Sequence, residues 1–263
     1  MLRTLIDGIG SRYDEYRTIL ANQNRRISMS FVMRDILNAE QRNHNKTLYR
    51  KIMQERLKAK FNEGYLRAML ESLDFISKYF KGLPDLARED LLEYAAGKVT
   101  LDGVWAEFGV FKGYSLNIIA SLTRNIVHGF DSFDGLPEDW TQTMKKGAFR
   151  ISEKDVLRLR KNVKLHKGLF SDTLPEFKEE NEGKFMAFLH VDCDLYSSAK
   201  TVLTTLKPMI KPGTVILFDE YYNYEMWKDH EYKAFMEFVK EAGLNFQYLG
   251  YNSNGEQVAV VIV

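Results

Sequence analysis

The chain has 263 residues, 45% of them hydrophobic and 28% charged, which is enough to bury one large core or a core with an appendage. A formal net charge of +1 provides no bulk attraction to nucleic acid or to an anionic membrane, so we expect neither as a partner. The single cysteine, Cys193, excludes an internal disulfide, and no apolar run approaches the roughly 18 residues of a membrane helix. We therefore expect a cytoplasmic protein.

The first 98 residues are predicted to be helical. Hydrophobic residues recur at helical spacing in the second half of this region, at Leu66, Met69, Leu70, Leu73, Ile76 and Phe80. Gly82 and Pro84 end that helix, and a short one is predicted over Arg88 to Ala96. Residues 1–70 hold 14 Lys or Arg against 7 Asp or Glu, which indicates either a solvated helical surface or an anion-binding face.

From residue 99 onward, short apolar runs alternate with helical patterns. The expected strands are Val104 to Phe108, Ile126 to Phe130, Val163 to His166, Phe185 to Val191, Thr214 to Phe218, Asn245 to Leu249 and Gln257 to Val263. This alternation predicts an α/β fold with a doubly wound, seven-stranded, mostly parallel sheet. The short loop from Gly250 to Gly255 permits a hairpin, so the last strand is expected to be antiparallel.

A glycine-containing turn follows the first strand, in the stretch EFGVFKGYS at 107–115. Gly109 and Gly113 allow a sharp turn and close approach of a ligand, and Ser115 can cap the next helix and bind a carboxylate. The spacing is neither that of dinucleotide-binding loops nor that of phosphate-binding loops. Asp131 ends the second strand, about 20 residues beyond the turn, where it can accept hydrogen bonds from ribose hydroxyls. A nucleoside-containing cofactor is expected.

Acidic residues follow two later strands, in the stretches HVDCDLYSS at 190–198 and FDEYY at 218–222. The carboxyl ends of parallel strands meet at one edge of a sheet, so we expect Asp192, Asp194, Asp219 and Glu220 to converge. Clustered hard oxygen ligands indicate a divalent metal, with Mg²⁺ as the default and Mn²⁺ as the alternative.

These stretches, together with FDSFDGLPEDW and KGLFSDTLP, resemble the macrocin O-methyltransferase (TylF-like) family of class I S-adenosylmethionine-dependent methyltransferases. The resemblance covers residues 104–263 and implies a Rossmann-like catalytic domain over 99–263. Residues 1–98 match only in general character, and we expect this helical region to bind the acceptor, to form oligomer contacts, or both. A homo-oligomer is favoured.

The resemblance also implies roles for individual residues. Asp192, Asp219 and Glu220 match metal ligands, and Asp194 matches the general base. At position 220 relatives more often have Asp, so the longer Glu220 alters the coordination geometry. The implied cofactor-binding residues are Glu107, Gly109, Gly113, Ser115, Asp131, Ser132, Ser171 and Asp172.

The resemblance implies O-methylation of a sugar hydroxyl on a glycosylated or nucleotide-linked small molecule. The residues fit this chemistry, because a neutral hydroxyl must lose its proton as the methyl group arrives, and a metal with a nearby carboxylate can remove it. Three alternatives stay open: O-methylation of a phosphate-type or phosphoramidate-type oxygen in surface-polysaccharide biosynthesis, a non-catalytic cofactor-binding or nucleotide-binding module, and a nicotinamide-dependent oxidoreductase. The glycine spacing and the acid cluster disfavour the last.

Several further residues border the expected cleft. The aromatic candidates for substrate contact are Tyr221, Tyr222, Trp140 and Tyr196. His190 lies inside an apolar strand, where a histidine is more often a buried structural residue, so we assign it a supporting role. Residues 135–152 contain helix and strand breakers with mixed polarity, and we expect them to form a loop that closes over the acceptor.

Overall fold

The computed structural model describes residues 63–263. A boundary between two units falls after Leu70, and Glu71–Val263 forms the second, compact unit. The helices expected before residue 63 and most of the basic 1–70 segment lie outside the described residues. Within residues 63–263, no helix combines the length and apolar character needed to cross a membrane.

The second unit is built on one seven-stranded sheet, with the strand order β3-β2-β1-β4-β5-β7-β6. Its strands are β1 (Val104–Phe108), β2 (Val127–Asp131), β3 (Val163–Lys167), β4 (Met186–Val191), β5 (Val215–Phe218), β6 (Phe246–Tyr251) and β7 (Val258–Ile262). β1 to β5 pair in parallel, whereas β7 runs antiparallel to both β5 and β6. The predicted fold class is confirmed, including the antiparallel last strand.

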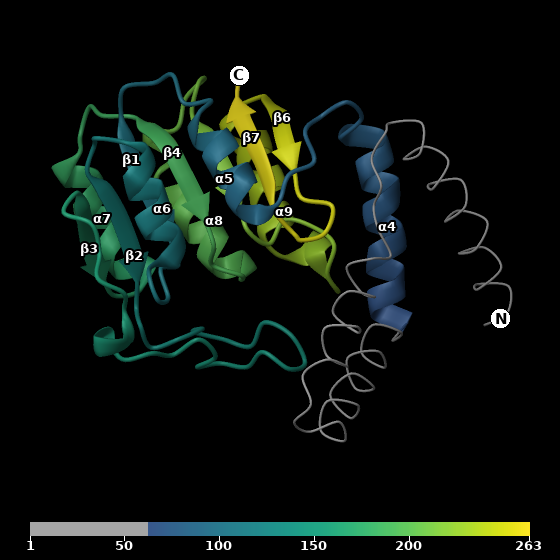
Figure 1. Cartoon of the computed structure of the whole chain (residues 1–263), viewed down its shortest axis with the longest axis horizontal. Helices are drawn as coiled ribbons and strands as arrows, with labels where there is room; N and C mark the ends of the chain where they lie inside the picture. Colours follow the sequence, from purple (N-terminus) through teal and green to yellow (C-terminus); the bar gives the residue numbers. More distant parts are fainter. Residues whose placement is uncertain (1–62) are drawn as a thin grey trace, which may run out of the picture. The chain divides into compact units, whose positions relative to one another are not determined.

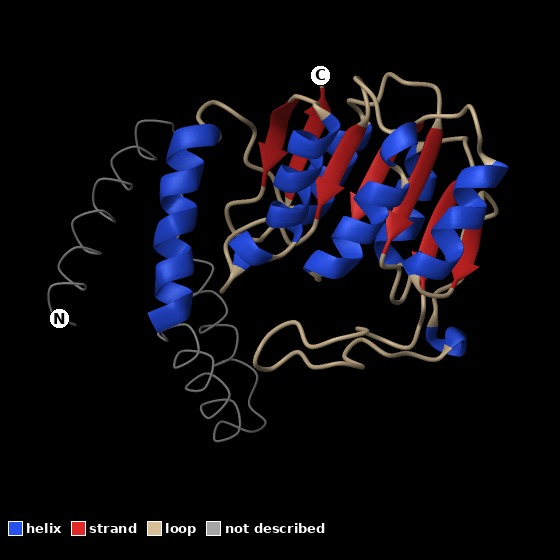
Figure 2. Ribbon diagram, turned by 180° about the vertical axis from the view of Figure 1, so that it is seen from behind, coloured by secondary structure: helices blue, strands red, loops and turns tan. Residues whose placement is uncertain are grey.

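Helices cover both faces of this sheet (Figures 1 and 2). Helices α5 and α6 lie over one face, and α7, α8 and α9 lie over the other. Their bounds are α5 (Arg88–Ala96), α6 (Tyr114–Leu122), α7 (Phe170–Glu180), α8 (Tyr196–Thr205) and α9 (Glu231–Ala242), preceded by α4 (Glu63–Tyr79). Three 3₁₀ turns, η1 (Glu153–Asp155), η2 (Lys207–Met209) and η3 (Trp227–Asp229), lie in the connections.

The central strands are apolar except for Glu107 in β1 and His190 in β4, as expected for strands that helices cover on both sides. Every residue of β1, β4 and β5 is buried. A cluster of aromatic side chains joins the C-terminal turns of α4 to the antiparallel end of the sheet. Phe75 forms its centre, with ring centroids 5.3 Å from Trp227 and 6.1 Å from Tyr248. These contacts fix residues 71–80 against the sheet and α9 side of the second unit.

All five parallel strands end at the same edge of the sheet, and the connections that follow them gather there. The long connection between β2 and β3, residues 132–162, runs along this edge in Figure 1. We call residues 135–152 of this connection the flap. The edge and the flap together define where a ligand can bind.

Candidate active site

The glycine turn after β1 brings two distant segments into contact. Gly109 has a φ of 97°, and a Cβ atom at this position would overlap the carbonyl oxygen of Asp192. The backbone N–H of Asp192 in turn donates to the carbonyl oxygen of Phe108, at 2.9 Å. Gly109 is therefore required so that the turn after β1 can touch the acidic segment after β4.

Asp131 organises the same turn from the end of β2. Its Oδ2 accepts hydrogen bonds from the backbone N–H groups of Val110 and Phe111, each at 2.8 Å, and its Oδ1 accepts one from Phe133 at 2.7 Å. The carboxylate is thus held rigidly while it lines the cavity beside the turn. A fixed carboxylate here remains able to accept further hydrogen bonds through its free lone pairs.

The helix after the turn begins differently from the sequence-based expectation. Gly113, with a φ of 82°, is the N-cap of α6, and no side chain caps this helix. The prediction that Ser115 caps the helix is wrong, because the left-handed turn at Gly113 starts the helix two residues earlier and places Ser115 in its first turn. Ser115 nevertheless lines the cavity, as the cofactor assignment requires.

A cavity of about 480 Å³ lies at the carboxyl edge of the sheet. It collects most of the residues selected from the sequence, from five separate connections. Those that line it are Gly109, Ser115, Asp131, Ser132, Ser171, Asp192, Asp194, Asp219 and Glu220. The glycine turn and the acid cluster therefore belong to one site.

Arg88, the first residue of α5, bridges two of the acids. Its Nη2 lies 2.8 Å from Asp192 Oδ2 and its Nε lies 2.7 Å from Asp219 Oδ1. Burial opposes the charged guanidinium, but the hydrogen bond and charge of Asp219, with the charge of Asp192, outweigh it and raise the pKa of Arg88. The acids thus already hold one cation at the cavity wall.

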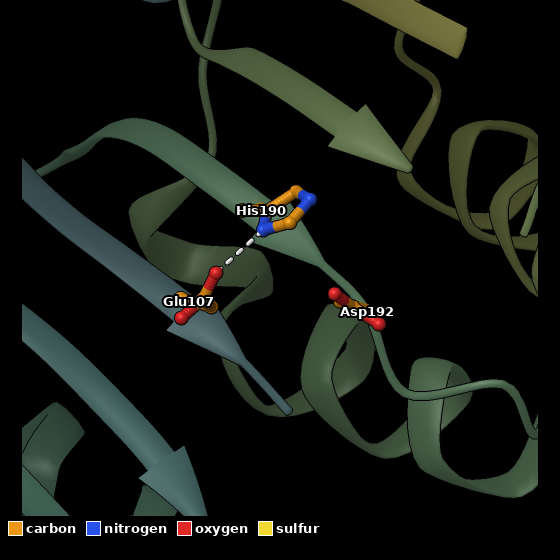
Figure 3. A group of neighbouring side chains, drawn as sticks. All are labelled: Glu107, His190 and Asp192. Atoms are coloured by element: carbon orange, nitrogen blue, oxygen red, sulfur yellow. Dashed lines mark hydrogen bonds and ion pairs between the residues drawn. The ribbon is translucent and has the colours of Figure 1, made fainter. Parts of the chain in front are cut away.

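Behind the acids lies a buried pair, drawn in Figure 3. His190 Nδ1 lies 2.7 Å from Glu107 Oε1, and its Nε2 lies 3.6 Å from Asp219 Oδ1. Burial disfavours the imidazolium, but these two carboxylates outweigh that effect and raise the pKa of His190 to about 10. His190 is therefore expected to carry a positive charge beside Asp219. Burial opposes ionisation of Asp219, but the hydrogen bond and charge of His190, with those of Arg88, outweigh it and lower the pKa of Asp219.

Two groups of side chains could hold a metal ion among the described residues. Glu107, His190 and Asp192 form one group, and Asp192, Asp219 and Glu220 form the other, with the potential ligand atoms of each lying within 4.8 Å of one another. Glu107 and His190 are fully buried and do not line the cavity, and His190 is committed to Glu107. The second group faces the cavity, and the buried Oε2 of Glu220 has no hydrogen-bond partner among the described residues.

The second group fits a divalent cation chemically. Its donors are three carboxylates, the hard oxygen ligands that Mg²⁺ and Mn²⁺ prefer. Burial, followed by the charge of Asp219, raises the pKa of Asp192 and of Glu220 well above the usual range. A bound divalent cation would compensate this repulsion.

Asp194 lies next to this group in an unusual conformation. Its φ of 63° is in the left-handed region, and the turn closes through a 2.6 Å hydrogen bond from the Leu195 N–H to the Cys193 carbonyl. The chain thus leaves the extended conformation here, and Asp194 does not simply continue the strand face of Asp192. Burial, with the charge of Asp219, raises the pKa of Asp194 to about 7.

Glu231, the first residue of α9, joins the two acidic segments. One oxygen, Oε1, accepts from the backbone N–H of Cys193, and the other, Oε2, accepts from the backbone N–H of Glu220, both at 3.2 Å. The side chain is completely buried. Burial, with the charge of Asp194, raises the pKa of Glu231 to about 8 against the opposing effect of the two backbone hydrogen bonds.

The structure does not bring all the selected residues to the cavity wall. Tyr221 and Tyr222 are fully buried in the aromatic cluster, where their hydroxyl groups contact Tyr248 Oη and the Asn252 carbonyl. The Tyr196 hydroxyl donates to Glu237 on α9. None of these three tyrosines lines the cavity, and the same is true of Glu107, Gly113, Trp140 and Asp172.

The flap forms one wall of the cavity through Gly135, Leu136, Pro137 and Phe149. Leu136 and Ala148 are joined by a 2.9 Å backbone hydrogen bond, which folds the flap back on itself. Its outer part is attached to the core at two points: Ser197 Oγ donates to Glu138 at 2.6 Å, and the Trp140 ring packs 5.6 Å from that of Tyr224. The flap therefore lies beside the cavity, and its closure over an acceptor stays a prediction.

A protein-family model described as a methyltransferase domain matches residues 106–221, which include the glycine turn and both acidic segments. Residues 106–221 are thus similar to methyltransferase domains. The resemblance inferred from the motifs is confirmed at this level. Two curated relatives are the 8-demethyl-8-(2,3-dimethoxy-alpha-L-rhamnosyl)-tetracenomycin-C 4'-O-methyltransferase of Streptomyces olivaceus and the demethyldecarbamoylnovobiocin O-methyltransferase of Streptomyces niveus.

These relatives are 28% and 29% identical to this chain over 164 residues, or 52% and 53% of its length. The matched region spans 60% and 61% of the two relatives. Among solved structures, the calicheamicin methyltransferase CalS11 is 21% identical with a TM-score of 0.56, and covers 83% of this chain and 94% of its own. The O-methyltransferase NovP is 22% identical with a TM-score of 0.52, and covers 66% and 78%. These structural similarities establish the class I methyltransferase fold.

Arg88 and Glu231 are the site residues that sequence reasoning missed. Arg88 lies 131 positions before its partner Asp219, and Glu231 lies 38 positions after Cys193. Each begins a helix, where a charged residue is ordinarily a solvated end group. No local pattern distinguishes such a residue from one that packs its helix terminus against a site.

Proposed function

We propose that this methyltransferase is an S-adenosylmethionine-dependent and divalent-metal-dependent O-methyltransferase that acts on a sugar hydroxyl of a glycosylated or nucleotide-linked small molecule. The observation that carries the proposal is the single cavity in which the glycine turn and Asp131 face the acids Asp192, Asp219 and Glu220, with Asp194 beside them. A cofactor pocket and a proton-accepting acid cluster are the two halves that such a transfer needs.

The cofactor half lies around the turn after β1. When bound, S-adenosylmethionine supplies the methyl group as an electrophilic carbon on a sulfonium. In this proposal the backbone at Gly109, with Ser115, binds the methionine carboxylate, and Gly113 shapes the turn between them. Asp131 accepts hydrogen bonds from the ribose hydroxyls. Ser132 and Ser171 lie beside the nucleoside, Asp172 accepts a hydrogen bond from Ser171, and Glu107 acts indirectly by holding His190. The rigid carboxylate of Asp131 supports this arrangement.

The acceptor half lies around the acids. When bound, a divalent ion lowers the pKa of an acceptor hydroxyl and orients its oxygen. Asp192, Asp219 and Glu220 would hold this ion, and Asp194 would receive the hydroxyl proton. A base with a pKa of about 7 is suited to this task near neutral pH. Of the four aromatic candidates, we retain Trp140, on the outer part of the flap, for contact with the acceptor. Tyr221, Tyr222 and Tyr196 support the fold around the site.

The sugar assignment rests on the relatives. One of them is named for methylation of a rhamnosyl group, and a structure of CalS11, with a TM-score of 0.50, is titled as a TDP-rhamnose 3'-O-methyltransferase. Both printed activities place a methyl group on a sugar hydroxyl. The same acceptor class suits a site that combines three carboxylates with a neighbouring base.

The test is a screen of deoxysugar nucleotides and glycosides with methyl-labelled S-adenosylmethionine, with and without a chelator. We expect label transfer to a sugar hydroxyl that stops with chelation and returns when Mg²⁺ or Mn²⁺ is added. Transfer that is unaffected by thorough chelation would contradict the metal role, while cofactor binding without transfer to any hydroxyl acceptor would favour a binding module.

A further inference from the structure

Glu231 forms a bridge between two segments that carry the acids of the site. Its two oxygens each accept one backbone N–H, from Cys193 in the connection after β4 and from Glu220 in the connection after β5. Cys193 separates Asp192 from Asp194, and the Glu220 amide directly follows Asp219. One side chain thus spans the two halves of the acid cluster.

The bridge uses an acceptor on each of two oxygens. Both backbone groups that face Glu231 are N–H donors, and each carboxyl oxygen accepts from one of them. A glutamine of the same shape would accept one bond and turn its own NH₂ group toward the second N–H. The first turn of α9 also favours a negative charge, because its free N–H groups carry partial positive charge.

The bridge has an electrostatic cost that a purely structural residue would avoid. Glu231 is completely buried beside other carboxylates, and Asp194 and Asp219 both oppose its ionisation. Burial of an acid among acids is unfavourable unless hydrogen bonds and a nearby cation compensate it. Glu231 does not line the cavity, so it does not contact a ligand directly.

We propose that Glu231 is a positioning residue for metal binding: by tying the Cys193 and Glu220 amides together, it sets the separation of Asp192 from Asp219 and Glu220. This inference rests on the proposed function, since it concerns the same acids. Loss of the bridge would let the two connections separate, and the three carboxylates would then no longer converge. Metal affinity should fall while the cofactor end of the cavity, built on β1 and β2, keeps its affinity.

The experiment measures Mn²⁺ binding to the full chain by the loss of the free-ion electron paramagnetic resonance signal. Glu231→Gln keeps the shape and removes one acceptor, and Glu231→Asp keeps the charge and shortens the reach. Glu237→Gln is the matched control, because Glu237 is on the same helix and pairs with Lys200 and Tyr196 away from the acids. Calorimetry with S-adenosylhomocysteine reports whether each variant is folded at the cofactor end.

We expect both Glu231 variants to bind Mn²⁺ at least tenfold more weakly than the wild type, with S-adenosylhomocysteine affinity within about twofold, and Glu237→Gln to behave as the wild type. If the wild type binds Mn²⁺ and both Glu231 variants bind it equally well, the positioning role is overturned and the proposed function stands. If the variants lose both ligands together, Glu231 serves the fold and the specific role is again overturned. If the wild type binds no Mn²⁺, the metal site fails and takes this role with it.

Discussion

Asp194 combines backbone strain, burial and a raised pKa at one position. A non-glycine residue with a φ of 63° costs of the order of 1 kcal/mol or more, and such residues persist where the surrounding structure holds them. Here the strained turn directs the acid into the cavity beside the candidate ligands instead of along the strand. The pKa of about 7 then leaves a carboxylate that is ionised near neutral pH and is still basic enough to accept a proton.

Replacing Asp194 with Asn should lower kcat for a hydroxyl acceptor by about a hundredfold or more, because the amide cannot receive the proton. S-adenosylhomocysteine affinity should stay unchanged. Radiolabel transfer under saturating substrates gives kcat, and calorimetry gives the affinity. Asp90→Asn, an exposed acid on α5, is the control. Substantial remaining turnover in Asp194→Asn would point instead to an acidic acceptor oxygen, such as a phosphate or phosphoramidate, which needs no base.

His128 offers a test of pH dependence away from the site. His128 Nδ1 lies 2.9 Å from His166 Nε2, and burial, followed by the charge of His166, lowers the pKa of His128 to about 4. The unfolded chain, with a pKa near 6.5, binds a proton in this interval that the folded chain does not. The contribution of neutral His128 to the free energy of unfolding should therefore be fully present above pH 6.5 and should be lost as the pH drops toward 4.

The variant His128→Gln removes this titration. Between pH 7 and pH 4 its free energy of unfolding should decrease by about 1–2 kcal/mol less than the free energy of unfolding of the wild type decreases. Urea denaturation followed by circular dichroism at several pH values measures the difference. The neighbouring His166, whose pKa burial also lowers, should leave a smaller acid dependence in the variant. Parallel pH profiles for the two proteins would show that His128 does not contribute.

At the scale of elements, strands were predictable and their side-chain partners were not. The run Val104 to Phe108 is β1, and Arg88 to Ala96 is α5, because apolar periodicity is a local property of the chain. The convergence of Asp192 with Asp219 could also be predicted from the sequence, since parallel strands end at one edge of the sheet. The ion pairs of Arg88 could not be derived, because they depend on how a helix end is placed against the sheet.

The attachment of the flap belongs to the same scale. The Trp140 ring packs 5.6 Å from that of Tyr224 and 6.4 Å from that of His230, and so fixes the outer part of the flap. Trp140→Ala should speed hydrogen exchange at residues 135–150 by about tenfold and weaken S-adenosylhomocysteine binding severalfold, because flap residues line the cavity. Trp140→Phe should preserve most of the packing. Equal exchange in the wild type and both variants would show that the flap is held elsewhere.

Across the second unit, the connections after β4 and β5 and the start of α9 place five acidic side chains in one small volume. Asp192, Asp194, Asp219, Glu220 and Glu231 are brought together from segments up to 39 residues apart, with Arg88 and His190 as the neighbouring cations. Repulsion among these carboxylates at one edge of the sheet therefore destabilises the fold. The arrangement predicts that the whole molecule responds to a divalent cation, and not only its catalytic rate.

Mg²⁺ or Mn²⁺ at a hundred times its dissociation constant should stabilise the native chain by about 2.7 kcal/mol, which corresponds to a rise in Tm of roughly 5 °C. Differential scanning calorimetry with the ion, and then with excess chelator, measures the rise and its reversal. Glu220→Gln is the informative variant, because Glu220 Oε2 has no hydrogen-bond partner among the described residues and its loss leaves the Arg88 and His190 pairs intact. The variant should be at least as stable as the wild type without metal, since it relieves like-charge repulsion, yet its Tm should respond little to the ion. An equal rise in both proteins would mean that the ion binds elsewhere.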